Sequence, residues 1–256
     1  MVNKNVCVVQ ARLGSKRLPG KVLMELCDKP MLVHIVERLK SVDRIDRIIV
    51  ATGGIVLNDP IREACAKYQI ECYSGDEDDV LDRVYRAVQP MKPRNILRVT
   101  ADCPLIDPTI VTELIEYFEA NHLDHCGVAT GAGVSSQSNI KKFPDGLDCE
   151  IMSFKSLETA WINAIKKEER EHVTPYIWKR PSMFKTGALY AKKDLSDYRL
   201  TVDNAEDFEL INWIYTELYP KYGLFTLDKV IQQLDNYPKF KKINRKFLGQ
   251  EGYENI

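Results

Sequence analysis

The sequence predicts a doubly wound α/β fold, in which helices cover both faces of a twisted, mainly parallel sheet. Two observations lead to this prediction. Short, β-branched apolar runs typical of buried strands recur along the chain, and segments with apolar residues every three or four positions separate them. This alternation of strand and helix is typical of parallel sheets. The 256 residues, 45% of them hydrophobic, are enough to fill the core of such a fold.

The first half of the chain carries most of this pattern. Strands are expected at 6–9, 47–51 and 96–99. Helices are expected after Pro30, from Asp59-Pro60, over 80–88 and from Asp107-Pro108. The last of these begins with an N-cap residue followed by a first-turn proline, which is a typical helix start. We therefore expect residues 1–129 to form a nucleotide-binding α/β core.

A change of composition marks the end of this core. Residues 130–139 are rich in Gly, Ser and other polar residues and predict a mobile loop at the start of an insertion. A strand at 149–152, a helix at 154–164 and a strand at 184–190 then predict a smaller subdomain over 130–195. A strand at 199–202 leading into a helix after Asp203 returns the chain to the core, with the C-terminal helices completing 196–256.

Composition excludes several classes of protein. Lys and Arg number 36 against 37 acidic residues, so the net charge of −1 gives no general attraction to nucleic acid or to anionic membranes. No apolar run approaches the length that a bilayer requires, and the first residues lack a signal-peptide core. The seven cysteines are scattered without a CxxC pair, which argues against disulfides and structural zinc. We expect a cytoplasmic protein.

A basic loop directly follows the first predicted strand. Residues 10–21 contain two glycines, Gly14 and Gly20, and four cations, which are Arg12, Lys16, Arg17 and Lys21. Open α/β sheets bind ligands at this position, where glycines admit backbone N–H groups to an anion and the cations neutralise phosphate oxygens. The spacing fits neither a P-loop nor a dinucleotide fingerprint. A triphosphate site is predicted; the alternative is a basic surface loop with a turn at Pro19-Gly20.

Two aspartates are candidates for a metal ion that accompanies the triphosphate. Asp102 follows the strand predicted at 96–99, and Asp203 follows the strand predicted at 199–202. Both are therefore expected at the same edge of the sheet as the basic loop. Carboxylates at such an edge suit the magnesium ion of a nucleotide. The alternatives are a turn before Pro104 for Asp102 and a helix cap for Asp203, a role that Asn204 could fill instead.

Five motifs in order resemble one family. Residues 10–21, 100–105, 144–148, 170–176 and 201–203 are similar to the cytidylyltransferases of the spore coat polysaccharide biosynthesis protein F type, relatives of the CMP-Kdo and CMP-sialic acid synthetases. The resemblance implies a Rossmann-like nucleotidyltransferase fold, CTP as donor, Mg²⁺ as cofactor and a homodimer. It also implies CMP transfer to a small sugar-like, acidic or phosphorylated acceptor, with release of pyrophosphate, in polysaccharide or surface-glycan precursor synthesis.

The resemblance assigns roles to individual residues. It implies that Arg12, Lys21, Asp102 and Asp203 are catalytic, and that the two aspartates hold the metal. Nucleotide binding is implied for Ala11, Arg12, Gly14, Ser15, Lys16, Arg17, Lys21, Gly75, Asp79 and Arg83. Acceptor binding is implied for Asp145, Asp148, Glu150, Arg170 and His172. The motifs at 144–146 and 170–172 depart from those of the Kdo and sialic acid enzymes, so the acceptor need not be a 2-keto acid sugar.

Several alternatives stay open on the sequence. His172 lies in a charged helical segment, where a structural hydrogen bond is as good an explanation as acceptor binding. His122 and His125 are interpreted as solvated loop residues rather than metal ligands. A non-catalytic nucleotide-sugar-binding module would keep the basic loop without both aspartates, and a glycosyltransferase would carry a D-x-D pair on one loop, which Asp102-Cys103-Pro104 does not supply.

Overall fold

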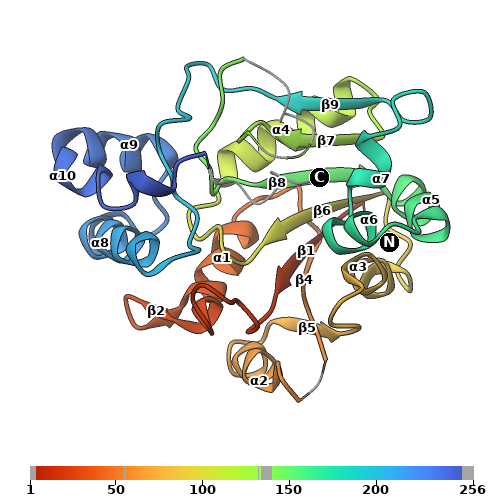
Figure 1. The fold of residues 1–256 in the computed structure, drawn as a ribbon, viewed down its shortest axis with the longest axis horizontal. Helices are drawn as coiled ribbons and strands as arrows, with labels where there is room; N and C mark the ends of the chain where they lie inside the picture. The colour runs from red at the N-terminus through yellow and green to blue at the C-terminus, as the bar shows by residue number, and fades with distance from the viewer. Residues whose placement is uncertain (1–3, 55, 132, 134–139, 250–256) are drawn as a thin grey trace.

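The computed structural model describes residues 4–54, 56–131, 133 and 140–249, and its centre is a seven-stranded sheet (Figure 1). The strand order is β5-β4-β1-β6-β8-β7-β9. The strands are β1 (Asn5–Ala11), β4 (Arg47–Thr52), β5 (Glu71–Ser74), β6 (Asn95–Thr100), β7 (His125–Val128), β8 (Cys149–Ser153) and β9 (Thr186–Leu189). All pairings are parallel except those of β8, which runs antiparallel to both β6 and β7. The expected mainly parallel sheet is confirmed.

Ten α-helices surround the sheet and the site in the described part of the chain. They are α1 (Met31–Lys40), α2 (Asp59–Lys67), α3 (Val80–Val88), α4 (Pro108–Ala120), α5 (Phe154–Asn163), α6 (Lys167–His172), α7 (Pro175–Trp178), α8 (Ala205–Tyr222), α9 (Leu227–Asn236) and α10 (Pro238–Lys241). Short elements are the hairpin β2 (Glu25–Leu26) and β3 (Lys29–Pro30) and the 3₁₀ turns η1 (Lys21–Leu23) and η3 (Arg245–Phe247). The helices predicted in the first half all form, and Asp107 caps α4 by accepting a hydrogen bond from the Thr109 amide at 2.8 Å.

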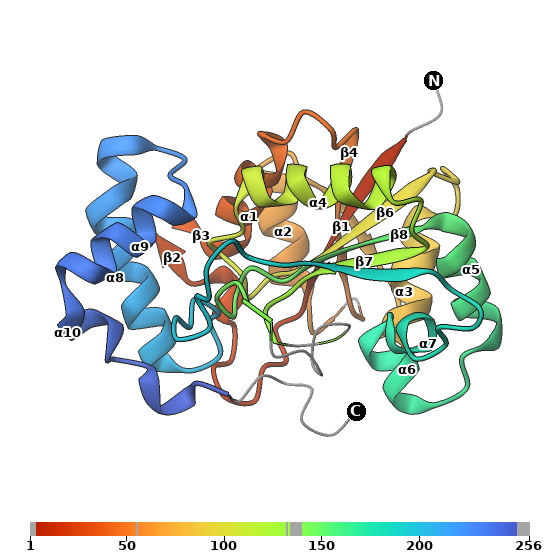
Figure 2. The same ribbon diagram turned by 90° about the horizontal axis from the view of Figure 1, so that it is seen from above.

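The strands bury both of their faces because helices cover each side of the sheet (Figure 2). Cys7, Val9 and Ala11 of β1 join one core cluster with residues of α1, α2, α4, α8 and α9. Val6 and Val8 point the other way and pack with residues of α3, α5 and α7. Because side chains alternate along a strand, each strand contributes residues to the hydrophobic core on both faces of the sheet. This two-sided burial explains why the strands read as continuous apolar runs in the sequence.

Residues 130–195 supply β8 and β9 to the same sheet and α5, α6 and α7 to one of its faces. The strand predicted at 149–152 and the helix at 154–164 are present as β8 and α5. The strand predicted at 184–190 is present as β9, shorter by a few residues. The loop predicted at 130–139 lies largely outside the described residues. No helix within the described ranges is both long and apolar enough to cross a bilayer.

Two expectations about local structure are wrong. Residues 199–202 form no strand; Arg199 makes an isolated bridge with Asp145, and the segment bonds to loops, with Val202 N donating to Asp102 O at 2.8 Å. The reason is that β6 already pairs with β1 and β8, so the segment finds no free strand edge there. His125, expected in a solvated loop, is fully buried within β7, whereas His122 is exposed as expected.

Candidate active site

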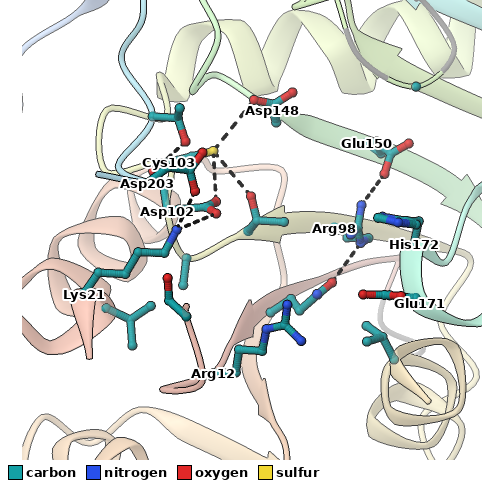
Figure 3. Close-up of a pocket in the computed structure, with 18 of the residues that line it drawn as sticks. Arg12, Lys21, Arg98, Asp102, Cys103, Asp148, Glu150, Glu171, His172 and Asp203 are labelled. Atoms are coloured by element: carbon teal, nitrogen blue, oxygen red, sulfur yellow. Dashed lines mark hydrogen bonds and ion pairs between the residues drawn. The ribbon is translucent and has the colours of Figure 1, made fainter. Parts of the chain in front are cut away.

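A cavity of about 650 Å³ opens at the carboxyl ends of β1 and β6 (Figure 3). The basic loop after β1 forms one wall, and the start of the reversed strand β8 and the end of α6 form another. Parallel strands bring the loops that follow them to one edge of the sheet, which is where open α/β sheets bind ligands. Acidic and basic side chains both line the cavity. Lys21, Asp102 and Asp203 gather at one end, and Arg12, Arg98 and His172 lie at the other (Figure 3).

The basic loop is held in a fixed shape by its own backbone and by one buried side chain. Gly20 adopts φ +72°, and its amide donates to Leu13 O at 3.2 Å, which closes the loop before η1. The fully buried Asn58 accepts a hydrogen bond from the Leu13 amide at 2.9 Å. Six expected residues of this loop line the cavity: Arg12, Gly14, Ser15, Lys16, Arg17 and Lys21.

Lys21 joins the two candidate metal aspartates. Its ammonium group lies 3.1 Å from Asp102 Oδ2 and 2.9 Å from Asp203 Oδ1, and it also donates to Val202 O at 2.7 Å (Figure 3). Burial alone would lower the pKa of Lys21, but the two carboxylates outweigh it and raise the pKa. Burial tends to raise the pKa of Asp102, yet Lys21 brings it below the ordinary value. The convergence of these carboxylates, 101 positions apart, comes from the hydrogen bond between Val202 and Asp102.

A buried arginine holds Asp203 from behind. Arg199, 3% exposed, donates from Nη2 to Asp203 Oδ2 at 3.0 Å and from Nη1 to Asp145 Oδ2 at 2.5 Å. It also forms a two-point contact with the buried Asp207, which itself forms a capping box with Asn204 at the start of α8. Asn204 and Asp207 therefore provide the helix cap, and the side chain of Asp203 faces the cavity.

Gly146 allows the 199–202 segment to approach the loop that carries Asp145. Its φ is +101°, and a Cβ atom there would lie 2.2 Å from Thr201 N and 2.3 Å from Leu200 C. The Gly146 amide donates to Asp148 Oδ2 at 3.1 Å, and the Thr130 hydroxyl donates to Asp148 Oδ1 at 2.6 Å. Burial, with the nearby negative charges of Asp102 and Glu150, raises the pKa of Asp148 despite these bonds.

A charged network forms the floor at the other end of the cavity. Arg98 Nη1 donates to Glu150 Oε2 at 2.7 Å, and Arg98 Nε donates to Gln10 Oε1 at 3.1 Å. The register places Arg98 opposite Glu150 across β6 and β8, so the pair is built into the sheet. Glu150 Oε1 also contacts His125 Nε2 at 3.1 Å and accepts from Thr174 Oγ1 at 2.8 Å. Burial would raise the pKa of Glu150, but these partners lower it to about 2.

A strained turn at the end of α6 positions His172. Val173 has φ +71°, unusual for a β-branched residue, and the Thr174 amide donates to His172 O at 2.8 Å. The turn directs His172 and Glu171 into the cavity and Thr174 toward Glu150. Burial, with the charges of Arg98 and Arg12, lowers the pKa of His172 despite the opposing charges of Glu171 and Glu150.

Comparison with known proteins identifies the family of this chain. The chain matches the family model described as cytidylyltransferase over residues 6–243. It belongs to the cytidylyltransferase family.

Two relatives and one solved structure each match most of the chain. An uncharacterised protein of Methanocaldococcus jannaschii is 37% identical over 99% of both chains. Spore coat polysaccharide biosynthesis protein SpsF of Bacillus subtilis is 32% identical, covering 84% of this chain and 87% of its own. A solved cytidylyltransferase from Leptospira borgpetersenii superposes with a TM-score of 0.83 at 27% identity, covering 98% of this chain and 99% of that one. The resemblance seen in the five motifs is confirmed, and so is the nucleotidyltransferase fold.

Five residues expected in this cytidylyltransferase site do not line the cavity. Arg170 forms a two-point ion pair with Asp79, and Asp79 caps α3 through the Asp82 amide. Arg83 is fully buried and donates from Nη1 to the carbonyls of residues 76 and 77, behind the loop that contributes Asp78 to the cavity. Gly75 packs against Arg83, and Ala11 lies buried in β1. These residues support the wall of the cavity, and their roles in nucleotide and acceptor binding stay predictions.

The structure adds residues to the site that the sequence analysis did not single out. Gln10, Arg98, Cys103 and Glu171 all line the cavity. Gln10, Cys103 and Glu171 lie within the motifs at 10–21, 100–105 and 170–176, and Arg98 could have been found because a charged residue within the apolar run at 96–99 needs a buried partner. Cys103 lies 3.6 Å from Asp102 Oδ1 and 3.8 Å from Asp148 Oδ2, between the two acidic side chains.

Proposed function

We propose that this cytidylyltransferase transfers CMP from a magnesium-bound CTP to a small acidic, sugar-like acceptor, in the synthesis of a polysaccharide or surface-glycan precursor. The observation that carries the proposal is the single ammonium group of Lys21 shared by Asp102 and Asp203 at the end of the phosphate loop. A position between two carboxylates that already attracts a cation suits a metal. The spore coat relative supports the glycan setting by its name.

The donor set fits magnesium. Mg²⁺ is usually held by one or two carboxylates together with substrate phosphates rather than by a complete protein cage. In the described part of the chain, no group of three or more His, Cys, Asp or Glu side chains is arranged for a metal, so the remaining ligands would come from CTP and water. Asp102 and Asp203 would hold the ion, which supplies Lewis-acid polarisation of the α-phosphate when bound.

The residues of the loop would carry the rest of the donor chemistry. Arg12, Lys16, Arg17 and Lys21 offer four positive charges to a triphosphate, and the charge that builds up on departing pyrophosphate is stabilised by the same groups. The hydrogen bonds of Gly20 and Leu13 fix the backbone of the loop, so that its side chains can turn to the phosphates without reorganisation of the backbone. An acceptor oxygen attacks the α-phosphorus, the bond between the α-phosphorus and the oxygen that bridges to the β-phosphate breaks, and pyrophosphate leaves. A carboxylate or phosphate acceptor reacts as its anion and has no proton to lose, whereas a hydroxyl acceptor must give its proton to a side chain or to water.

The end of the cavity that carries Arg12, Arg98 and His172 offers hydrogen-bond donors to the acid group of the acceptor. Arg98 is fixed by Gln10 and Glu150, and Arg12 and His172 lie nearby. The lowered pKa of His172 means that this ring favours its neutral form, as a hydrogen-bonding group beside an arginine. A carboxylate or phosphate bound here could accept hydrogen bonds from Arg12 and His172, while hydroxyl groups would meet Asp145, Asp148 and Glu171.

The test is a reaction of the protein with CTP, Mg²⁺ and a panel of sugar acids and sugar phosphates, each paired with its neutral analogue. We expect pyrophosphate release to require CTP and an acidic acceptor, and a CMP adduct to form in equal amount. Release of free sugar or transfer from a nucleotide sugar would favour a glycosyltransferase. Tight CTP binding without turnover across the panel would favour a binding module. Best activity with another nucleoside triphosphate would correct the choice of base.

We further propose a cytoplasmic homodimer that associates through residues 130–195. Four exposed apolar side chains lie in the described part of this segment: Ile140, Ile162, Ile165 and Met183, which are 55%, 64%, 91% and 57% exposed. Sedimentation should give a dimer that Ile165→Glu weakens. Val56→Glu, at an 89% exposed position outside the segment, is the matched control and should leave the dimer intact. A monomer at all concentrations would contradict this proposal.

A further inference from the structure

The position between Asp102 and Asp203 already contains a positive charge that belongs to the protein. Lys21 Nζ lies within 3.1 Å of a carboxylate oxygen of each residue and also within 2.7 Å of a backbone carbonyl. The Lys21 side chain is 9% exposed, so solvent screens these contacts little. The ammonium thus occupies the position between the two carboxylates that a metal ion would take.

Asp203 has no oxygen without a cationic partner. Oδ1 accepts from Lys21 and also pairs with Arg17 Nη2 at 3.0 Å. Oδ2 accepts from the buried Arg199 at 3.0 Å. Arg199 also donates hydrogen bonds to Asp207 and Asp145, which hold it in place. Lys21 and Arg17, in contrast, both belong to the loop that is built to bind phosphate.

From these contacts we infer that Lys21, assisted by Arg17, excludes divalent metal from the nucleotide-free protein. The triphosphate opens the metal site because it draws both cations away from Asp203. The inference rests on the proposed magnesium site. A divalent ion and an ammonium group repel each other strongly at such a short distance, so they cannot share both carboxylates. Metal therefore enters with the nucleotide or after it, and not before.

This arrangement has a function in the reaction sequence. Without nucleotide, two carboxylates facing one cavity would repel each other, and Lys21 keeps them together in the geometry that the metal needs. When CTP binds, the charge that leaves the aspartates is delivered to the phosphates. The same side chain thus acts first as a positioning residue for the metal ligands and then as a phosphate ligand. By linkage, the effect of CTP on metal affinity equals the effect of metal on CTP affinity.

The test measures binding of Mn²⁺, as a spectroscopic substitute for Mg²⁺, to the nucleotide-free protein by the electron paramagnetic resonance signal of the free ion. We expect Lys21→Met to bind Mn²⁺ at least about tenfold more tightly than the wild type, because a competing cation is removed. Lys16→Met is the matched control: Lys16 is exposed in the same loop, forms no ion pair with a described residue, and should change Mn²⁺ affinity little. Asp203→Asn added to Lys21→Met should abolish the gain.

Arg17→Met gives a second variant that does not depend on a buried position, since the Arg17 side chain is 49% exposed. It should show a smaller gain of the same sign. Equal Mn²⁺ affinity in the wild type, Lys21→Met and Arg17→Met would overturn the inference, as would tight nucleotide-free binding by the wild type. These outcomes differ from failure of the proposed function, in which Mn²⁺ would not bind even with CTP present.

Discussion

Glu150→Gln tests the charged floor of the cavity in a way that can be followed by stability alone. Glu150 is only 14% exposed at its side chain and is the partner of Arg98 at 2.7 Å. Glutamine keeps the size and one acceptor oxygen but removes the negative charge. Arg98, 7% exposed, would keep its charge without that partner. Removing one partner of a buried pair is costly because the other charge is left uncompensated.

The magnitude follows from the pKa. The folded protein lowers the pKa of Glu150 from 4.5 to about 2, and about 1.4 kcal/mol per pKa unit gives about 3 kcal/mol of stability. A lowered carboxyl pKa contributes its full stability above the unfolded value of 4.5 and loses it as pH falls toward the folded value. We therefore expect Glu150→Gln to cost about 3 kcal/mol at neutral pH and about half of that near pH 3.3.

Urea unfolding of both proteins between pH 7 and pH 3.3 measures this difference. Glu71→Gln is the matched control, because Glu71 makes the same kind of contact with Arg47 on the surface, where both side chains are more than 40% exposed, at 41% and 45%. That control should cost less than about 1 kcal/mol. The reasoning is refuted if Glu150→Gln is as stable as the wild type at pH 7, or if the gap does not narrow below pH 4.5.

Three further predictions concern the rest of the site. Asp102→Asn and Asp203→Asn should each lower kcat by about a hundredfold or more in protein that circular dichroism shows to be folded at the assay temperature, and near-normal turnover would remove that residue from the mechanism. Gly146→Ala should destabilise by more than about 2 kcal/mol, since its Cβ would meet Thr201 N at 2.2 Å; an unchanged unfolding midpoint would contradict the close approach. Asp148→Asn should stabilise at neutral pH and lose this gain as pH falls toward 3.8, because a raised carboxyl pKa costs stability above the unfolded value; urea unfolding at both pH values decides.

The sheet and the loop after β1 were predictable because their signals are local. A β-branched run followed by glycines and cations indicates both a strand and a candidate phosphate-binding loop, as for β1 and residues 12–21. Helix starts such as Asp107-Pro108 are equally local. The prediction of a strand at 199–202 was wrong because these apolar residues pack between loops instead of in the sheet. The local sequence pattern is the same in both cases. Asp203 nevertheless reaches Asp102, through backbone pairing rather than through the sheet.

Residues whose role depends on a distant partner were not predictable. Arg170 pairs with Asp79, 91 positions away, which its spacing in the sequence does not reveal; its role in acceptor binding stays a prediction. Arg98 and Glu150 are joined by the antiparallel register of β6 and β8, which no spacing in the sequence reveals. His125 looked solvated because β7 is only four residues long, too short to give a periodic signal. In each case the contacts or the burial of the side chain are set by tertiary pairing.

A crystal structure with CTP and Mg²⁺ tests the central claim most directly. We predict that the triphosphate lies against residues 12–21 and that the metal ion contacts both Asp102 and Asp203, with Lys21 Nζ moved from the carboxylates to the phosphates. A triphosphate bound elsewhere, or a metal ion that touches neither aspartate, would contradict the account.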